Sequence, residues 1–318
     1  MKDELGATGR AMLLAACEAS SAKEFAEEVP GLVRHWIPHD SYLISGQDPV
    51  TGAICFWLAD QAYLAELIGR VCRIDTPLYW YGTGSAEPAG PRVCERPHRL
   101  ITRLADRRHT LGALTLVRTG ACPFSGDEVA RAAALSGPVA QALRRFIAGT
   151  SLPPPPPTAP GVVTVGTDHT LLGITPTARD TLRVLWPDNS AVDDRRLVSV
   201  LWNSVHLTRQ AGRHTVSRLP TPDGWLAVHA EPLEPDGSAA VGVTIEPARG
   251  ELLLPVLAAW YGASPAELGV VRQVTAGLPA KQIARRLNLS LHTVHDHLRS
   301  IYRKTGVTGC HELHARLG

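Results

Sequence analysis

Five consecutive prolines, at residues 153–157, constrain this chain more than any other feature of its 318 residues. Proline has a fixed φ and no backbone N–H, so such a run cannot lie inside a helix or an inner strand. It is typical of a stiff polyproline II spacer. The run therefore predicts a proline-rich linker over residues 151–160, which separates residues 1–150 from the rest of the chain.

Residues 1–150 have the pattern of an α+β unit. Helical patterns at residues 9–19 and 21–36 are followed by extended runs at residues 41–45, 53–57 and 111–117. Ser125 then begins a closing helix, with Glu128 three residues on as its capping-box partner. This order of elements resembles a GAF-like domain, which implies a sensor of small molecules.

Residues 161–248 are predicted to form a second α+β unit that is rich in strands. The extended runs are residues 162–165, 213–218, 225–232 and 239–245, and a helical piece at residues 177–185 precedes the last three. Pro-Asp-Gly turns at residues 222–224 and 235–237 join these three into an antiparallel meander. The order resembles a PAS-like fold, and a linker helix over residues 249–262 follows it.

The carboxy-terminal part of the chain carries a charge surplus that the rest lacks. Residues 261–318 hold two lysines and six arginines against three acids, a net +5. The whole chain is +2, so residues 1–260 are at +2 − 5 = −3. A small basic domain on a slightly acidic body indicates nucleic-acid binding, although a solvated surface has the same composition.

Capping signals predict an all-α domain of four helices over residues 263–318. Ser264, Pro265 and Glu267 begin the first helix, and the second covers residues 280–287. Ser290 begins the third, which extends to Thr305, and residues 310–317 form the last. Two helices joined by so tight a turn predict a helix-turn-helix.

The third helix divides into two faces at 100° per residue. Its apolar face consists of Val294, Leu298, Ile301 and Tyr302. The opposite face consists of His292, His295, Asp296, Arg299 and Arg303. All five have hydrogen-bonding heads that can meet base edges in a major groove, where arginine suits guanine O6 and N7.

Several motifs here resemble the LuxR-type (GerE-type) DNA-binding domain: Gly277-Leu278, residues 283–287, residues 292–298 and residues 301–307. The form of residues 292–298 is similar to an actinobacterial subgroup with an amino-terminal GAF-like sensor. The resemblance implies that His295, Asp296 and Arg299 face bases and that Lys281, Thr293, Arg303 and Lys304 lie near phosphates. With Ser290 and His292 they make up the predicted DNA-binding set. It also implies a homodimer contact through Leu313 and Leu317.

Most aromatic residues lie in the first unit, which permits two interpretations. The candidates for a pocket are Trp36, Tyr42, Phe56, Trp57, Tyr79, Trp80 and Tyr81, with Tyr63 as a further neighbour. Core packing explains most such groups, and an apolar pocket for an unidentified small ligand is the functional alternative.

Other classes of protein are disfavoured. No run of 18 apolar residues and no signal-peptide pattern occurs, and six scattered cysteines without a CxxC pair indicate a reducing cytoplasm. No P-loop, GxSxG or HExxH motif occurs, and neither a metal nor a cofactor is predicted. We therefore expect a cytoplasmic, non-enzymatic transcription regulator that binds an operator in double-stranded DNA and acts with RNA polymerase. The alternatives are an adaptor with a degenerate DNA-binding domain and an enzyme in the first unit.

Overall fold

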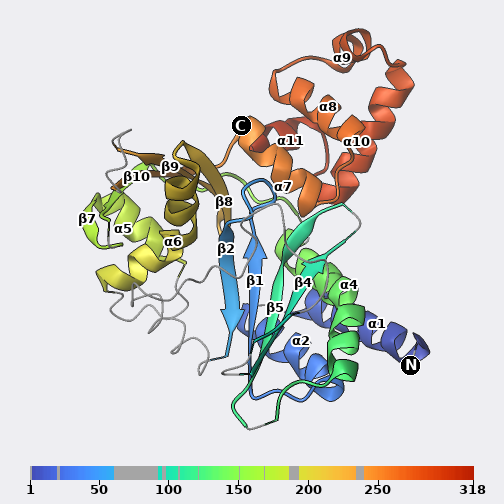
Figure 1. Cartoon of the computed structure of the whole chain (residues 1–318). Helices are drawn as coiled ribbons and strands as arrows, with labels where there is room; N and C mark the ends of the chain where they lie inside the picture. The colour runs from blue at the N-terminus through green and yellow to red at the C-terminus, as the bar shows by residue number, and fades with distance from the viewer. Residues whose placement is uncertain are drawn as a thin grey trace.

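The computed structural model shows two antiparallel sheets followed by a helical carboxy-terminal part (Figure 1). It describes residues 2–19, 22–60, 92–94, 98–106, 108–120, 122–149, 151–167, 169–185, 193–233 and 240–318. The α+β character predicted for both amino-terminal units is confirmed. None of the helices in these ranges is both long enough and apolar enough to cross a membrane.

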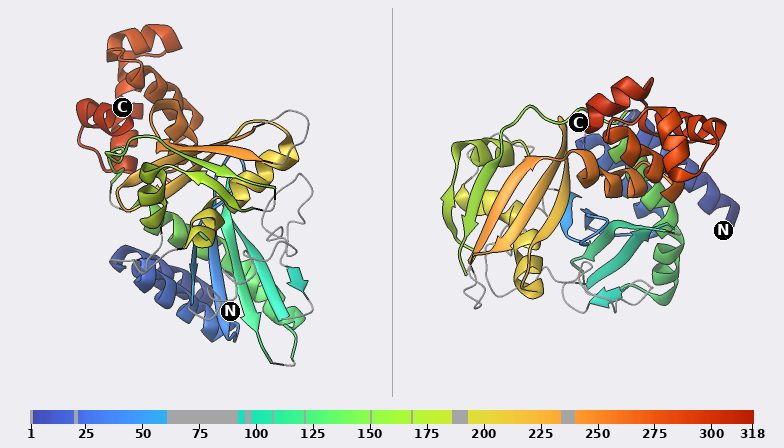
Figure 2. Two further views of the ribbon diagram at one scale, coloured as in Figure 1. Left: turned by 90° about the vertical axis from the view of Figure 1, so that its left-hand side faces the viewer. Right: turned by 90° about the horizontal axis from the view of Figure 1, so that it is seen from above.

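The first sheet has the strand order β2-β1-β5-β4-β3, with every neighbouring pair antiparallel. Its strands are β1 (Ser41–Gln47), β2 (Ile54–Ala59), β3 (Arg92–Cys94), β4 (His98–Ala105) and β5 (Thr110–Arg118). Helices α1 (Lys2–Glu18), α2 (Ala22–Trp36) and α4 (Gly126–Ala148) lie together on one side of it (Figures 1 and 2). Between sheet and helices lies a core in which Phe25 stacks on Phe146, with ring centroids 4.5 Å apart.

The closing helix of this unit begins where its capping box predicts. Ser125 Oγ accepts from the Glu128 amide, and Glu128 Oε2 accepts from the Ser125 amide. Arg118 on β5 donates to Glu128 Oε1 at 2.7 Å. This hydrogen bond, together with those from Ser125, lowers the pKa of Glu128 to about 2. The start of α4 is therefore fixed to the end of the central strand β5 by a charged pair as well as by apolar packing.

The second sheet has the order β7-β6-β10-β9-β8, which confirms the predicted meander of its last three strands. Its strands are β6 (Gly161–Val165), β7 (Leu171–Ile174), β8 (Thr215–Thr221), β9 (Gly224–Pro232) and β10 (Val241–Pro247). Helix α5 (Pro176–Arg183) matches the predicted helical piece, whereas α6 (Asp194–Ala211) has no counterpart in the sequence analysis. Both helices pack on this sheet through a second apolar cluster, which also includes Cys55 of β2.

The proline-rich segment has neither helix nor strand over residues 151–160, yet it is anchored at two points. The fully buried Leu152 donates its amide to the Thr305 carbonyl at 2.6 Å. Further on, the segment crosses the β8–β9 hairpin at Gly224, where an added Cβ would lie 2.5 Å from the Pro154 carbonyl oxygen. The segment is therefore held against Thr305 at one point and against the β8–β9 hairpin at the other.

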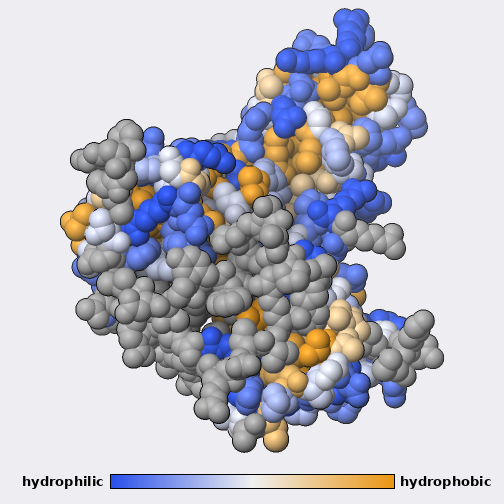
Figure 3. All heavy atoms as spheres, in the orientation of Figure 1, coloured by the Kyte–Doolittle hydropathy of each residue, from blue (hydrophilic) through white to orange (hydrophobic). Residues whose placement is uncertain are grey.

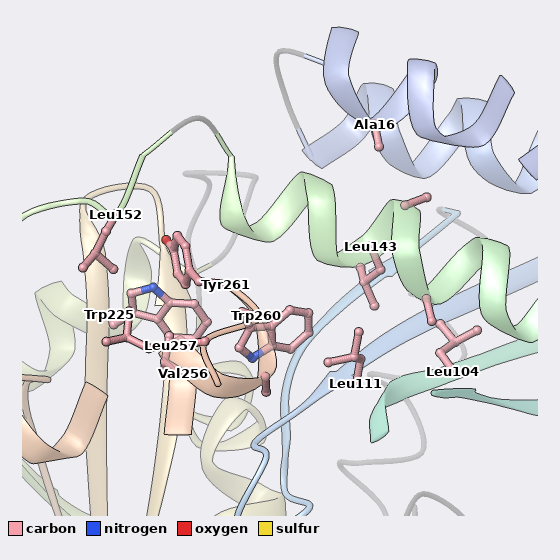
Figure 4. Close-up of a cluster of buried hydrophobic side chains, with 14 of the residues drawn as sticks. Ala16, Leu104, Leu111, Leu143, Leu152, Trp225, Val256, Leu257, Trp260 and Tyr261 are labelled. Carbon is pink, nitrogen blue, oxygen red and sulfur yellow. The ribbon is translucent and has the colours of Figure 1, made fainter. Parts of the chain in front are cut away.

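A short connector, made of the 3-10 helix η1 (Gly250–Leu253) and α7 (Leu254–Ala259), leads to the carboxy-terminal helices. Trp260 and Tyr261, which follow α7, lie where the first unit, the second unit and the carboxy-terminal helices meet (Figure 4). Trp260 packs against Phe56 of β2 and Trp225 of β9, with ring centroids at 5.9 and 6.4 Å. One apolar cluster consequently runs from the first unit through the connector into the last domain.

Candidate nucleic-acid interface

Four helices form the carboxy-terminal domain, which the structure describes without a gap. They are α8 (Pro265–Thr275), α9 (Ala280–Leu287), α10 (Leu291–Thr305) and α11 (Cys310–Leu317). Each begins and ends within a residue or two of the bounds expected from the sequence. Ser264 and Glu267 form the capping box of α8, and Ser290 Oγ accepts from the Thr293 amide at the start of α10.

The turn between α9 and α10 fixes the angle of the helix-turn-helix. Asn288 ends α9 in the left-handed region at φ 52°, a conformation that asparagine tolerates better than most residues. The Leu289 amide then donates to the Ala284 carbonyl at 2.9 Å, which satisfies an orphan carbonyl of α9. Ser290 follows at once as the N-cap of α10, so only three residues separate the two helices.

One side of α10 is held in the core of the domain. Val294, Leu298 and Ile301 are buried, and Tyr302 is half-buried against the same cluster. Thr305 is also buried, and its hydroxyl donates to the Ile301 carbonyl at 2.8 Å. This packing leaves the remaining face of α10 pointing away from α8 and α9.

That remaining face is exposed and polar, and it gathers the predicted residues of the third helix. They are His292, His295, Asp296, Arg299 and Arg303, all exposed in the full chain. Asp296 lies between two of them, with Oδ1 2.9 Å from Arg299 Nη2 and Oδ2 3.4 Å from His292 Nε2. The surface at the α9 end and along the outer margin is correspondingly hydrophilic (Figure 3).

Lys304 differs from Arg299 because its partner is a buried carboxylate on another helix of the domain. Its Nζ lies 2.7 Å from Glu267 Oε2, and this carboxylate is almost fully buried. Burial raises the pKa of Glu267, but hydrogen bonds from Lys304 and Ser264 outweigh it and bring the pKa to about 2. Lys304 therefore joins the last turn of α10 to the first turn of α8, and a phosphate contact by this residue stays a prediction.

Helix α9 places Arg285 and Arg286 beside Lys281, and the sequence analysis counted these two arginines without assigning them to the interface. Lys281, Arg285 and Arg286 are exposed, whereas Ile283 and Ala284 are buried. The helical wheel of α9 contains this signal, because burial of the apolar pair leaves the basic residues on the outer side. Ser290 is exposed and Thr293 half-buried at the adjoining start of α10, so the predicted set extends from α9 along α10 as far as its last turn, where Arg303 and Lys304 lie.

Leu313 and Leu317 do not occupy a dimer surface in this arrangement. Both are fully buried in their own chain, where α11 packs on α8. The four-residue spacing that suggested a dimer contact is the spacing of a core-facing stripe. A contact between two copies through α11 stays a prediction, and it would have to use the exposed His311, His314 and Ala315.

The described aromatic residues of the first unit lie in different surroundings. Trp36 donates from Nε1 to Thr8 Oγ1 at 3.0 Å between α2 and α1, and Phe56 packs on Trp260. Tyr42 is buried in the helix-side core, and burial raises the pKa of its phenol to about 12. Trp57 alternates to the opposite face of β2. Tyr79, Trp80 and Tyr81 lie outside the described residues.

Comparison with protein families gives one match. The family described as "Bacterial regulatory proteins, luxR family" matches residues 264–315, from the N-cap of α8 into α11. A search of curated protein sequences gives no match.

Among solved structures, Escherichia coli SdiA has 12% identity and a TM-score of 0.37, over 98% of this chain and 95% of that one. The phage VqmA–DPO complex has 17% identity and a TM-score of 0.21, over 54% and 85% of the two chains. The E. coli DhaR(N)–DhaL complex has 14% identity and a TM-score of 0.22, over 77% and 87%. TM-scores this low do not establish a common fold.

The family match covers the same residues whose caps, turn and exposed polar face have been described above. Residues 264–315 therefore form a helix-turn-helix domain of the luxR family of bacterial regulatory proteins.

Proposed function

We propose that this chain is a sequence-specific regulator of transcription that binds an operator in double-stranded DNA through α9 and α10. The observation that carries the proposal is the exposed polar face of α10, which remains uncovered by the body of the full chain. A helix with such a face, supported by a second helix across a tight turn, fits a major groove.

The exposed residues divide by chemistry into two groups. Arg299 has two donors in a fixed fork and suits guanine, while His295 and Asp296 stand beside it to contact neighbouring base edges. Lys281, Arg285, Arg286 and Arg303 are exposed cations placed to bind phosphates. The ion pair with Asp296 holds Arg299 toward one side of the helix, which narrows the bases that it can reach.

We further propose that the GAF-like and PAS-like units control this activity, through a small ligand or a protein partner. On the face of the first sheet away from its helices, Leu43, Ile54, Ile101, Ala113 and Val117 form a separate apolar cluster. Trp57 packs against this cluster, which makes it the most suitable of the predicted aromatic residues for a ligand site. A homodimer on an inverted repeat, in contact with RNA polymerase, completes the proposal.

Selection from a random-sequence duplex library with the full chain tests the proposal. We expect enrichment of one motif of definite sequence, bound with a steep dependence on salt. Binding without enrichment of any sequence would contradict specific recognition. Absence of binding by the folded chain would instead favour the adaptor.

A further inference from the structure

An ion pair between the two α+β units also contacts the connector. Arg218 on β8 donates from Nη1 to Asp48 Oδ2 at 3.1 Å, and both side chains are almost fully buried. The same guanidinium donates from Nε to the carbonyl of Leu252 in η1 at 2.9 Å. Arg218 thus links the β1–β2 hairpin, the second sheet and the beginning of the connector.

A second arginine makes the same kind of link at the other end of the connector. Arg144 on α4 donates from Nη2 to Asp106 Oδ2 at 2.5 Å. Its Nε donates to the carbonyl of Ala259, the last residue of α7, at 2.8 Å. The two arginines come from different units and bind carbonyls at opposite ends of η1–α7.

Each arginine is oriented by an aspartate that also shapes a hairpin. Asp48 Oδ1 accepts from the Thr51 amide at 2.7 Å in the β1–β2 hairpin. Asp106 Oδ1 accepts from the His109 amide at 2.6 Å in the β4–β5 hairpin. A change in the shape of either hairpin would therefore move the aspartate and, with it, the arginine that holds the connector.

The connector lies near the carboxy-terminal end of α10, the helix proposed to enter the major groove. Leu152 lies in the proline-rich segment shortly after the end of α4. It packs in the same apolar cluster as Val256 and Leu257 of α7 (Figure 4). Its amide donates to the carbonyl of Thr305, the last residue of α10. The position of the connector and the position of α10 are consequently joined through Leu152.

We propose that Arg218 and Arg144 form a two-point clamp, through which each α+β unit sets the position of the connector and thereby of the helix-turn-helix domain. The clamp is a coupling device: a signal that alters either hairpin releases one end of η1–α7. The exposed face of α10 is not covered in the clamped state, so the clamp fixes orientation rather than blocking access. The effect on DNA rests on the proposed function, while the mechanical coupling does not.

Arginine-to-lysine variants of the full chain separate the clamp from simple stability. Lysine keeps the charge for the aspartate but cannot donate at the same time, in the same fixed geometry, to the connector carbonyl. Arg218→Lys and Arg144→Lys are compared with Arg179→Lys, a control in α5 whose guanidinium pairs with Asp194 away from the connector. Arg144 is partly exposed, so its variant is expected to fold even where Arg218→Lys does not.

The first measurement is amide hydrogen exchange in peptides covering residues 248–262 and the amide of Leu152. We expect exchange there to become about tenfold faster in both clamp variants and to be unchanged in the control. Acceleration confined to the two hairpins, with a protected connector, would overturn the clamp.

The second measurement is affinity for the DNA selected with the wild-type chain. We expect both clamp variants to shift the Kd by at least about threefold in the same direction, with no shift in the control. A loosened connector with wild-type Kd would overturn the coupling. If no chain, wild-type included, enriches a sequence, the proposed function fails, and the exchange measurement still decides whether the clamp exists.

Discussion

Arg299 is the residue on which sequence recognition is expected to depend most. If its guanidinium binds a guanine, Arg299→Ala should cost about 1–3 kcal/mol of binding free energy and relax the preference at one base position. Titrations against operator variants measure both quantities. Arg316→Ala is a suitable control, because Arg316 pairs with Glu312 on α11. An equal loss on operator and random DNA would mean that Arg299 contacts phosphate only.

The carboxylate of Asp296 should lower the affinity for DNA and improve the discrimination between bases. Its carboxylate repels DNA phosphates, and it also holds Arg299 at 2.9 Å. We expect Asp296→Asn to bind random-sequence DNA more tightly and to discriminate less at the base read by Arg299. The ratio of operator to random affinity, compared between the two proteins, is the measurement. A ratio that stays constant would show that Asp296 does not position Arg299.

At the scale of the element, the capping box of α8 makes part of the stability sensitive to acid. Glu267 has a pKa of about 2 in the folded chain, against about 4.3 for an ordinary glutamate. A lowered folded pKa contributes stability that is complete above about pH 4.3 and is lost as the pH falls toward 2. Lys304→Ala removes the partner of this buried carboxylate. It should therefore lower the free energy of unfolding at pH 7 by about 1–2 kcal/mol.

Urea unfolding at pH 7 and pH 3 measures this contribution. The difference between wild type and Lys304→Ala should shrink at pH 3, because the unfolded chain then binds a proton at Glu267 that the folded wild type, with its pKa of about 2, does not bind. The salt dependence of DNA binding tests the alternative, in which Lys304 binds a phosphate. An unchanged unfolding free energy, with a salt slope lowered by about one, would assign Lys304 to a phosphate.

Elements with strong local signals could be predicted from the sequence, and elements defined by tertiary contacts could not. Serine caps, Gly306 and the proline at the start of α8 act within one turn, so the ends of α8 and α10 were predictable. Helix α6 was missed because its buried side also contains Ser199, Asn203, Ser204 and Thr208, which blur the apolar period. Strand β4 was missed because charged residues interrupt its apolar run at Arg99 and Arg103.

The candidate interface shows the same division. The exposed face of α10 follows from the wheel alone, because its apolar face is unambiguous. The pair of Lys304 with Glu267 joins residues 37 apart in the chain, and no periodicity predicts it. Leu313 and Leu317 show the limit most clearly: an apolar stripe is visible in the sequence, but whether its own domain or a second copy covers it depends on the packing of α11.

For the molecule as a whole, the shared apolar cluster predicts cooperative unfolding of the first unit, the connector and the last domain. Trp260 is nearly fully buried between Phe56 and Trp225, at the point where these parts meet. Trp260→Ala should cost about 3–5 kcal/mol. It should also accelerate hydrogen exchange in α8 and α10, far from the substitution. Thermal scans followed by circular dichroism and by exchange measure the two effects, and unchanged exchange in α10 would show that the last domain is independent.

Gly224 is a position at which the attachment of α10 can be altered without a substitution in α10 itself. Its φ of 140° and the close approach of Pro154 leave no room for a side chain. Any larger residue must push the proline-rich segment off the β8–β9 hairpin and pull on Leu152, whose amide holds the end of α10. A graded series of substitutions at Gly224 should thus change how firmly the end of α10 is attached, with every side chain proposed to contact DNA left intact.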